Sequence, residues 1–468
     1  MKADADVGAA ARVCAVAARV SFAAVVVLSP FRGRIEVVNR WRAPVYREFT
    51  DFLLSAGDIA IVLTLACWLA SRRLRPVRMP IAYGPRFLAW PVVGLLAAAV
   101  VGIPFSVDPA LSAYTCVRLA LLAGLALYVV NEISSIRQLV LPVGAMAAVQ
   151  AVVAIGQVVD QRSLSLGWLG EHVLRPSLGV SVVTTADGTR VLRGYGLTDH
   201  PNILGGMLAF AVLVLVGAAA AARRDRASAV SQLGTPVLVL SGAALFLTFS
   251  RGSWIGAVLG LVVIAAMLAL GPDRRALRPA AVAAVAVGLG VVPFVAPYHD
   301  VLAARTEASS TIATEARSID EREALTTVTS RIVSDHLLLG VGVGALPLAM
   351  RRAEPDFRYD YQPAASVLLD VTAETGVVGG FAYLVLLVAP WIALVRRWRT
   401  WTTELAAASG LVAAVTVIGV IDYYTWAYSP GRIWIWLILG IWAGAHGRSP
   451  SRPAAVAAPV PVHTSAVA

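Results

Sequence analysis

Long apolar stretches, separated by short polar connections, recur along almost the whole chain. Most are close to the roughly 20 residues that an α-helix needs to cross a bilayer. Strands of a membrane β-barrel are about half as long and alternate apolar with polar positions, so continuous runs exclude that class. We therefore expect an all-α polytopic membrane protein with about twelve transmembrane helices, at residues 13–30, 51–70, 87–104, 112–130, 137–158, 202–222, 232–249, 253–270, 279–297, 366–391, 405–421 and 431–446.

Two connections between these spans are much longer than a turn. They cover residues 159–201 and 298–365, and we expect the second to fold as a large extracytoplasmic loop element with a functional role. The tail, residues 447–468, is rich in Ala, Pro and Val, so we expect it to be disordered and cytoplasmic. Residues 1–446 would form a single polytopic domain. We find no internal repeat, which a transporter built from inverted repeats would have.

Arginines set the expected orientation. They cluster in alternate connections, at Arg72, Arg73, Arg75 and Arg78, at Arg223, Arg224 and Arg226, at Arg274, Arg275 and Arg278, and at Arg396, Arg397 and Arg399. Basic connections face the cytoplasm, so we expect both termini to be cytoplasmic. The first span is irregular, because Arg19 interrupts it and five arginines follow within residues 31–50. A cleaved signal peptide is the alternative, but no small-residue cleavage pattern is present.

The composition limits the classes of protein and of binding site that the chain can form. Of the 468 residues, 58% are hydrophobic and 14% are charged, about half the charged share of a soluble domain. The net charge of +11 is almost entirely arginine, with Lys2 as the only lysine. Because these arginines lie in short connections, they indicate orientation and not nucleic-acid binding. Cys14, Cys67 and Cys116 lie in separate apolar runs, so we expect no disulfide, metal or other cofactor.

Two short motifs place an arginine at the expected outer membrane edge. In "LRGYGLTDHPNILGG", residues 192–206, Arg193 precedes two glycines, and Asp199 or Asn202 could cap the following helix. In "TFSRGSWIG", residues 248–256, Arg251 lies in the tight hairpin that joins two spans. Each arginine either binds a ligand at this membrane edge or extends to the lipid phosphates.

Two further motifs have simpler readings. The alternating glycines of "DHLLLGVGVGALP", residues 335–347, suit a tight turn in a hydrophobic segment, since the lysine of a phosphate-binding loop is missing. The aromatic residues of "IDYYTWAYSPGRIW", residues 421–434, fit a belt at the membrane interface. Asp422 and Arg118 also lie at outer edges, where a charged side chain has either a structural partner or a function.

One absence matters for phosphate chemistry. The only Asp-x-Asp in the chain is formed by Asp4 and Asp6, in the N-terminal tail on the inner side. The outer side therefore lacks the familiar motif that holds a metal ion against a diphosphate. If a diphosphate is bound there, arginine has to bind it, and a guanidinium is permanently charged and able to contact two oxygens at once.

Taken in order, four segments resemble the O-antigen ligase and O-antigen polymerase superfamily. They are the arginine before "HPN", the "TFSRG" hairpin, "LLLGVGVG" and "AETGVVGG", and the resemblance covers roughly residues 190–445. It implies a metal-independent, inverting glycosyltransferase of the inner membrane, active on the extracytoplasmic face in cell-surface polysaccharide or lipopolysaccharide synthesis. The implied partners are a glycan donor on undecaprenyl diphosphate, a glycan or lipid-linked acceptor, and membrane lipid.

The resemblance also implies site residues. It assigns Arg193 and Arg251 to the donor diphosphate, where they would neutralise the charge that develops on the leaving group. We expect Asn202, Arg118 and Asp422 to assist in substrate binding.

One position departs from the family pattern. The family's late span begins with a histidine, assigned to activating the acceptor hydroxyl, eleven residues before the glycine that corresponds to Gly376. Here that position is Ala365, followed by Ser366. The flanking "YQP" and "AETG" are in place, so the alignment is secure at this position.

Three explanations for Ala365 stay open. The protein is impaired or regulatory, it uses another base, or it needs none; a general base is typically worth about 100- to 10,000-fold in rate. As catalytic substitutes we rank His200 and Glu374 first, since they adjoin family motifs, and then Asp422 and His336. The competing hypotheses are a transporter or flippase for lipid-linked sugars and a binding-only pseudoenzyme.

Overall fold

The computed structural model describes residues 2–75, 79–222, 227–306, 313–398 and 400–448. The predicted basic residues Arg78, Arg223, Arg224, Arg226 and Arg399, and the tail from residue 449 on, lie outside these ranges. A helix lies at each of the twelve predicted spans: α1 (Lys2–Leu28), α2 (Ala56–Leu74), α3 (Arg86–Val101), α4 (Pro109–Glu132), α5 (Val140–Asp160), α6 (Pro201–Ala220), α7 (Ala227–Leu247), α8 (Arg251–Leu270), α9 (Leu277–Val295), α13 (Val367–Arg396), α14 (Thr403–Ile421) and α16 (Ser429–Gly447).

The molecule is an all-α polytopic membrane protein, as predicted. Within the described ranges, eight helices are long and apolar enough to cross a membrane, and α3 and the apolar part of α7 are shorter. The outer face of α9 shows why lipid has to surround it. Val282, Val285, Leu289 and Val292 recur at helical spacing and are each 60 to 66% exposed. Such a continuous apolar stripe is stable only against another apolar surface.

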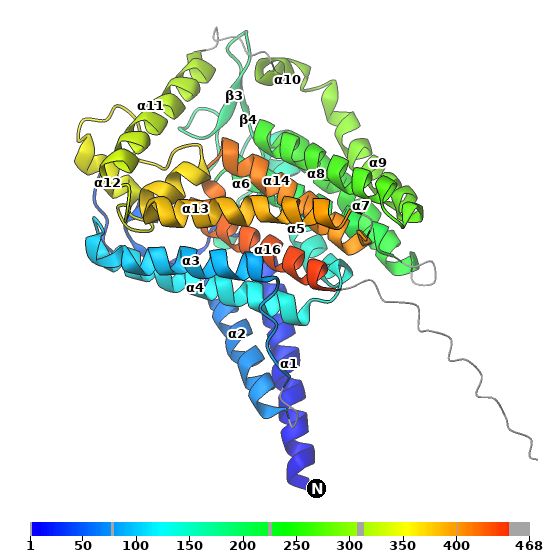
Figure 1. Cartoon of the computed structure of the whole chain (residues 1–468). Coiled ribbons are helices and arrows are strands. Elements are labelled where there is room, and N and C mark those ends of the chain that lie inside the picture. The colour runs from blue at the N-terminus through cyan, green and yellow to red at the C-terminus, as the bar shows by residue number, and fades with distance from the viewer. Residues whose placement is uncertain (1, 76–78, 223–226, 307–312, 399, 449–468) are drawn as a thin grey trace, which may run out of the picture.

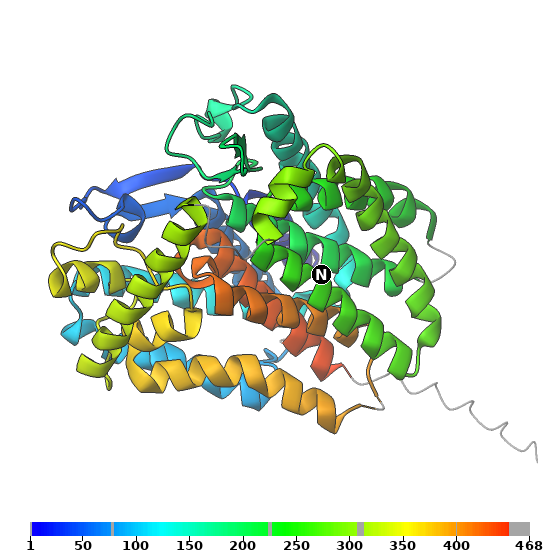
Figure 2. The ribbon, with the colours of Figure 1, turned by 90° about the horizontal axis from the view of Figure 1, so that it is seen from above.

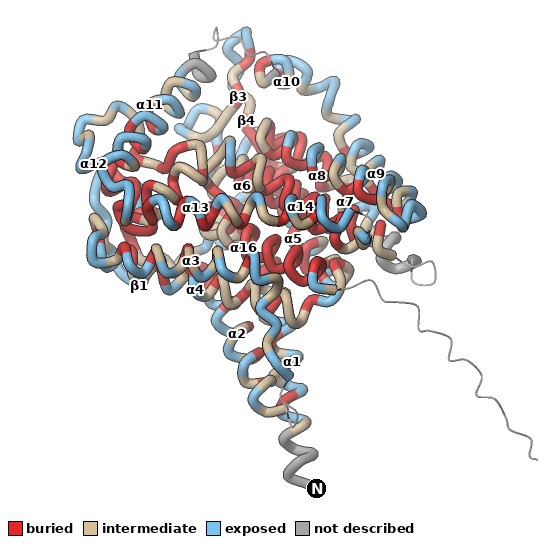
Figure 3. Tube along the Cα trace, in the orientation of Figure 1, coloured by how far each residue is buried: buried red, intermediate tan, exposed pale blue. Residues whose placement is uncertain are grey.

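The helices differ in how deeply they are buried. α6 and α14 lie at the centre and are buried along most of their length, whereas α1, α2 and α9 keep exposed faces (Figure 3). α14 packs against α6, α8 and α16, and α13 packs against α3. The α1–α2 hairpin extends from the body at a steep angle to α13 and α16 (Figure 1). The central helices therefore provide a rigid base for the polar segments at their ends.

The polar connections fold over one end of this bundle. Residues 298–365 form α10 (His299–Thr306), α11 (Ala313–Asp335) and α12 (Leu346–Ala353), and α15 (Tyr424–Ala427) follows α14. The two-stranded ribbons are antiparallel: β1 (Arg34–Val38) pairs with β2 (Phe52–Ser55), and β3 (Val182–Thr184) pairs with β4 (Arg190–Leu192). Helix α11 packs against α13, and the β3 and β4 strands lie near α10 and α5; Figure 2 shows the molecule from above.

The predicted loop element has its own apolar contacts with the bundle. Leu325, Val328 and Ile332 share one face of α11 and are buried in a cluster that also contains Leu346 and Met350 of α12. Residues three and four apart on a helix lie on the same face, which explains why this otherwise polar helix packs at all. The element is therefore a folded part of the molecule.

α13 is broken near its start, and the glycine segment fills the break. Gly376 has φ +71 and ψ −178, a conformation that is essentially restricted to glycine. A side chain at this position would overlap the carbonyl oxygen of Leu338. Three backbone hydrogen bonds join the two segments: Val341 N–H to Ala373 O at 2.9 Å, Gly342 N–H to Glu374 O at 3.0 Å, and Val377 N–H to Leu337 O at 2.8 Å. The alternating glycines thus belong to a loop docked on a broken helix.

Candidate functional site

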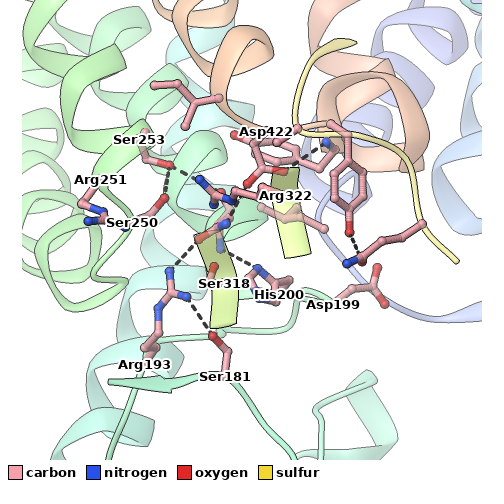
Figure 4. A pocket seen from close by; sticks show the side chains of 18 of the residues that line it. Ser181, Arg193, Asp199, His200, Ser250, Arg251, Ser253, Ser318, Arg322 and Asp422 are labelled. Carbon is pink, nitrogen blue, oxygen red and sulfur yellow. Dashed lines mark hydrogen bonds between the residues drawn. The ribbon is translucent and has the colours of Figure 1, made fainter. Parts of the chain in front are cut away.

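A cavity of about 570 Å³ lies where the starts of α6 and α8, the end of α14 and helix α11 meet (Figure 4). Its volume is in the range of sites that bind small molecules. Five arginines and three acids line it, together with four tyrosines: Arg190, Arg193, Arg251, Arg305 and Arg322, then Asp199, Glu321 and Asp422, then Tyr46, Tyr423, Tyr424 and Tyr428. The excess of positive charge suits an anionic ligand.

Arg193 is held in place from three directions. It follows β4 directly and is only 5% exposed. Its Nε donates to the carbonyl of Thr248 at 2.8 Å, Nη1 to Ser181 Oγ at 2.8 Å, and Nη2 to Asn202 Oδ1 at 2.6 Å. A guanidinium fixed in this way loses little further freedom when it binds a ligand.

Arg251 is the first residue of α8, in the hairpin that the sequence singles out. The hairpin backbone is unusual, because Phe249 has φ +47. Arg305 of α10 donates from Nε and Nη2 to the Phe249 carbonyl at 3.1 and 2.9 Å, and its own carbonyl accepts from Arg251 Nη1 at 3.4 Å. The loop element therefore braces the hairpin and adds a third arginine to the cavity.

Asn202 connects Arg193 to Asp422. Its Oδ1 accepts from Arg193, and its Nδ2 donates to Asp422 Oδ2 at 2.7 Å. Asp422 follows the last residue of α14 and also accepts the backbone N–H of Tyr424 on Oδ1 at 3.4 Å. Asn202 thereby links Arg193, which is close to it in the sequence, to Asp422, which lies far along the chain.

His200 has a structural task at the same place. It caps α6, since its Nδ1 accepts the backbone N–H of Asn202 at 3.1 Å. The sequence pattern offered Asn202 or Asp199 as the cap, and that expectation is wrong. Burial, with Arg193 nearby, lowers the pKa of His200 to about 3. Asp199 instead forms ion pairs with Arg34 and, at 3.2 Å, with Arg32.

Ala365 lies in the wall of this cavity. Asp370, on the first turn of α13, accepts the backbone N–H of Ala364 on Oδ1 at 2.9 Å and holds the segment before the helix. The position at which the resemblance expects a histidine therefore faces the same space as Arg193 and Arg251, with a methyl group in place of an imidazole.

Three predicted residues lie outside this cavity. Glu374 and Arg118 line a second, smaller cavity of about 50 Å³. Glu374 Oε2 accepts from Trp426 Nε1 at 2.8 Å, and Arg118 Nη2 forms an ion pair with Asp58 at 2.9 Å. His336 is exposed just beyond α11 and lines neither cavity. These positions give Glu374, Arg118 and His336 no direct access to a ligand between Arg193 and Arg251.

Three arginines of the cavity were not predicted from the sequence, namely Arg190 of β4, Arg305 and Arg322. Arg305 and Arg322 belong to the loop element, whose functional role was expected without named residues. Their signal was weak, because charged residues in a polar helical stretch look like an ordinary solvated face. Across the described ranges, no three His, Cys, Asp or Glu side chains converge as a metal site would require.

The chain was compared with known families and proteins. Residues 236–384 match the family model described as O-antigen ligase. No curated protein matches the chain significantly. The matched region contains Arg251, Arg305, Arg322 and Ala365, while Arg193 and Asp422 lie on either side of it. Over these residues the chain is similar to that family, which supports the resemblance to the O-antigen ligase and O-antigen polymerase superfamily that the motifs indicated.

Proposed function

We propose that the protein is a membrane glycosyltransferase that moves a glycan from a polyprenyl diphosphate to a sugar hydroxyl. The observation that carries this proposal is the meeting of Arg193 and Arg251, from two separate motifs, in one cavity with excess positive charge. A diphosphate is the ligand for which such a pair is best suited, since each guanidinium can contact two phosphate oxygens.

The proposed reaction depends on stabilising the charge of the leaving group. When the bond between the sugar and the diphosphate breaks, the leaving group gains negative charge. Arginines fixed before the reaction stabilise that charge without reorganising, which is the largest single contribution in many enzymes. Arg193 has its orientation set by Ser181, Thr248 and Asn202, and Arg251 has the brace from Arg305. Attack on the sugar from the face opposite the diphosphate would invert its anomeric carbon.

The proposed setting is the extracytoplasmic face of the inner membrane. Arginine clusters mark the connections on the other side, so both termini would be cytoplasmic. The apolar ends of α6 and α14 contribute Ile203, Ile418 and Ile421 to the cavity wall. These side chains would face the lipid portion of the donor, with the glycan on the side of the loop element. Ligation to lipid A–core and polymerisation of a repeat both fit this arrangement.

A transfer assay tests the proposal. Purified protein in lipid nanodiscs would receive undecaprenyl-diphosphate oligosaccharide, with either lipid A–core or a second molecule of the donor as acceptor. We expect transfer to fall about 100- to 1,000-fold in Arg193→Ala and in Arg251→Ala, the loss typical of one oxyanion-stabilising group. Arg331→Ala is the matched control, because Arg331 is an exposed arginine on α11 that does not line the cavity.

The possible outcomes separate the competing functions. Transfer that survives both arginine substitutions contradicts the proposed mechanism. Donor binding without transfer to either acceptor indicates a binding-only protein, which is the alternative that Ala365 raises. Movement of donor between the two leaflets without glycan transfer indicates a flippase.

A further inference from the structure

Transfer to a hydroxyl requires a group that accepts its proton. Ala365 cannot do so, and the arginines are already fully protonated. The side chains lining the cavity that can accept a proton are His200, Asp199, Glu321 and Asp422. Their hydrogen bonds and ion pairs distinguish them.

His200 and Asp199 are already committed to other partners. The Nδ1 lone pair of His200 accepts the Asn202 backbone N–H, so the proton of the neutral ring is on Nε2, which leaves a donor facing outward. Asp199 is paired with both Arg32 and Arg34, and its side chain is 10% exposed. Burial raises the pKa of Asp199, but its two ion pairs oppose that rise and occupy the carboxylate oxygens.

Glu321 lies in a different part of the cavity wall. It is on α11, and its Oε1 accepts from Gln362 Nε2 at 2.8 Å. Its charged neighbours are Asp360, Arg317 and Arg322, all from the loop element. No hydrogen bond connects it to Arg193 or Arg251 among the contacts of the described residues. Glu321 is therefore the natural comparison residue for an experiment.

Asp422 has the features that a base at this site needs. No ion pair within 4.0 Å involves its carboxylate in the described part of the chain. Its hydrogen-bond donors are the Asn202 side chain and the backbone N–H groups of Tyr424 and Tyr423. An ionised carboxylate has about four acceptor positions, so at least one remains for a substrate hydroxyl. The groups that face it are Arg322 on α11, Asp370 on α13, and Tyr423 and Tyr424 beyond α14.

Burial and hydrogen bonding also act on its protonation. Removal from water raises the pKa of Asp422, and Arg322 with the Asn202 hydrogen bond opposes part of that rise. A carboxylate with a pKa above its ordinary value is a stronger base. The link through Asn202 fixes the distance between this carboxylate and Arg193, which is needed if one group is to act on the acceptor while the other holds the donor.

We propose that Asp422 is the general base that activates the acceptor in this protein. This inference rests on the proposed glycosyltransferase function. A carboxylate oxygen of Asp422 takes the proton as the acceptor O–H bond breaks. The hydroxyl oxygen forms a bond to the anomeric carbon, and the bond from that carbon to the diphosphate oxygen breaks. The electron pair leaves with the diphosphate, held by Arg193 and Arg251.

The central experiment compares Asp422→Asn with Glu321→Gln. Asparagine keeps the size of Asp422 and an oxygen that accepts from Asn202, but it cannot take a proton at neutral pH. We expect transfer in Asp422→Asn to fall at least about 100-fold, with donor affinity changed less than about threefold. The acidic limb of the pH–rate profile, which reports protonation of the base, should disappear in this variant and remain in Glu321→Gln.

A second pair of variants separates catalysis from positioning. Asn202→Ala keeps the carboxylate but removes its link to Arg193, so it should weaken donor binding and retain the acidic limb. Ala365→His in the Asp422→Asn background places an imidazole in the same cavity. We expect it to restore part of the rate, with a new acidic limb near the ordinary histidine pKa of about 6.5.

The outcomes distinguish this inference from the proposed function. If the native protein neither binds nor transfers the lipid-linked oligosaccharide, the glycosyltransferase proposal fails. If it transfers, and Asp422→Asn does so within about threefold of the native rate with the same acidic limb, Asp422 is not the base. Loss of the acidic limb in Glu321→Gln would assign the role to Glu321 and overturn the inference.

Discussion

The ion pair between Arg118 of α4 and Asp58 of α2 shows whether Arg118 is structural or binds substrate. Arg118 Nη2 contacts both carboxylate oxygens at 3.0 and 2.9 Å, and Nε contacts Oδ1 at 3.2 Å. The two side chains are 14% and 9% exposed. Such a geometry joins α2 to α4, so we predict that Arg118 stabilises the fold.

The expected loss of stability depends on which buried charge each substitution leaves without a partner. Removing one partner of a buried ion pair costs about 3–5 kcal/mol, because the other charge stays buried alone. In Arg118→Met, Asp58 still accepts from the Ser55 N–H at 2.9 Å and from its hydroxyl at 2.7 Å. We therefore expect the lower value, about 3 kcal/mol, which is roughly a 100-fold change in the folding equilibrium. Adding Asp58→Asn removes the isolated charge, and the double variant should recover most of the loss.

The assay is reversible unfolding in mixed micelles, followed by tryptophan fluorescence, with donor binding measured on the same samples. Arg331→Ala again serves as the control, since its ion pair with Glu354 is exposed and worth at most about 1 kcal/mol. If Arg118→Met unfolds like the native protein but loses donor affinity, the ion pair is not structural and Arg118 belongs to a binding site.

Three further predictions concern single positions. Gly376→Ala should destabilise the fold by about 3 kcal/mol, because φ +71 with ψ −178 excludes a side chain, whereas Gly288→Ala should be tolerated, since no atom lies within 4 Å of its added methyl. Gly206→Ala would overlap the Tyr424 hydroxyl and lower the melting temperature, and Tyr424→Phe should restore part of it. His200 should make the native protein less stable as pH falls below about 6.5, and His200→Asn should flatten that dependence.

The sign of the histidine effect follows from linkage. The pKa of His200 is about 3 in the folded protein and about 6.5 when unfolded, so the unfolded chain binds the proton first. The contribution to stability is complete above pH 6.5 and is lost toward pH 3, by no more than about 1.4 kcal/mol per pH unit. Melting temperatures from pH 7.5 to 4.5 test it. An unchanged slope in His200→Asn would contradict the assignment. Equal melting temperatures for Gly376→Ala and Gly288→Ala would contradict the prediction for Gly376. An unchanged melting temperature in Gly206→Ala would contradict the prediction for Gly206.

The helices could be predicted because their signal is local. Most predicted spans are nearly continuous apolar runs, and a run of that length has one stable solution in a bilayer. The break at Gly376 could not be predicted in this way, since apolar residues continue through it and its partners are at Leu337–Gly342, more than thirty residues earlier. Arg193 and Arg251 could be paired from sequence only through the family resemblance.

The site residues, too, were hard to predict because their partners are distant in the sequence. Asp370 and Glu374 are four residues apart, and both are buried, as a shared helical face implies. Which cavity that face meets depends on the rotation of α13 in the bundle. That rotation directs Glu374 to Trp426 and away from Arg193 and Arg251. From the sequence alone, Asp422 ranks below His200 and Glu374 as a candidate base, because only the fold shows that Asn202 lies beside it.

The broken helix α13 has a consequence for how the protein is made. Backbone groups left unpaired inside a bilayer cost several kcal/mol each, so the break at Gly376 is tolerable only with its three hydrogen bonds to residues 337–342. These residues precede α13 in the chain and have already left the ribosome when α13 is inserted. Biosynthesis from the N-terminus thus delivers the docking partner before the helix that requires it, and a circular permutant with the opposite order should insert poorly.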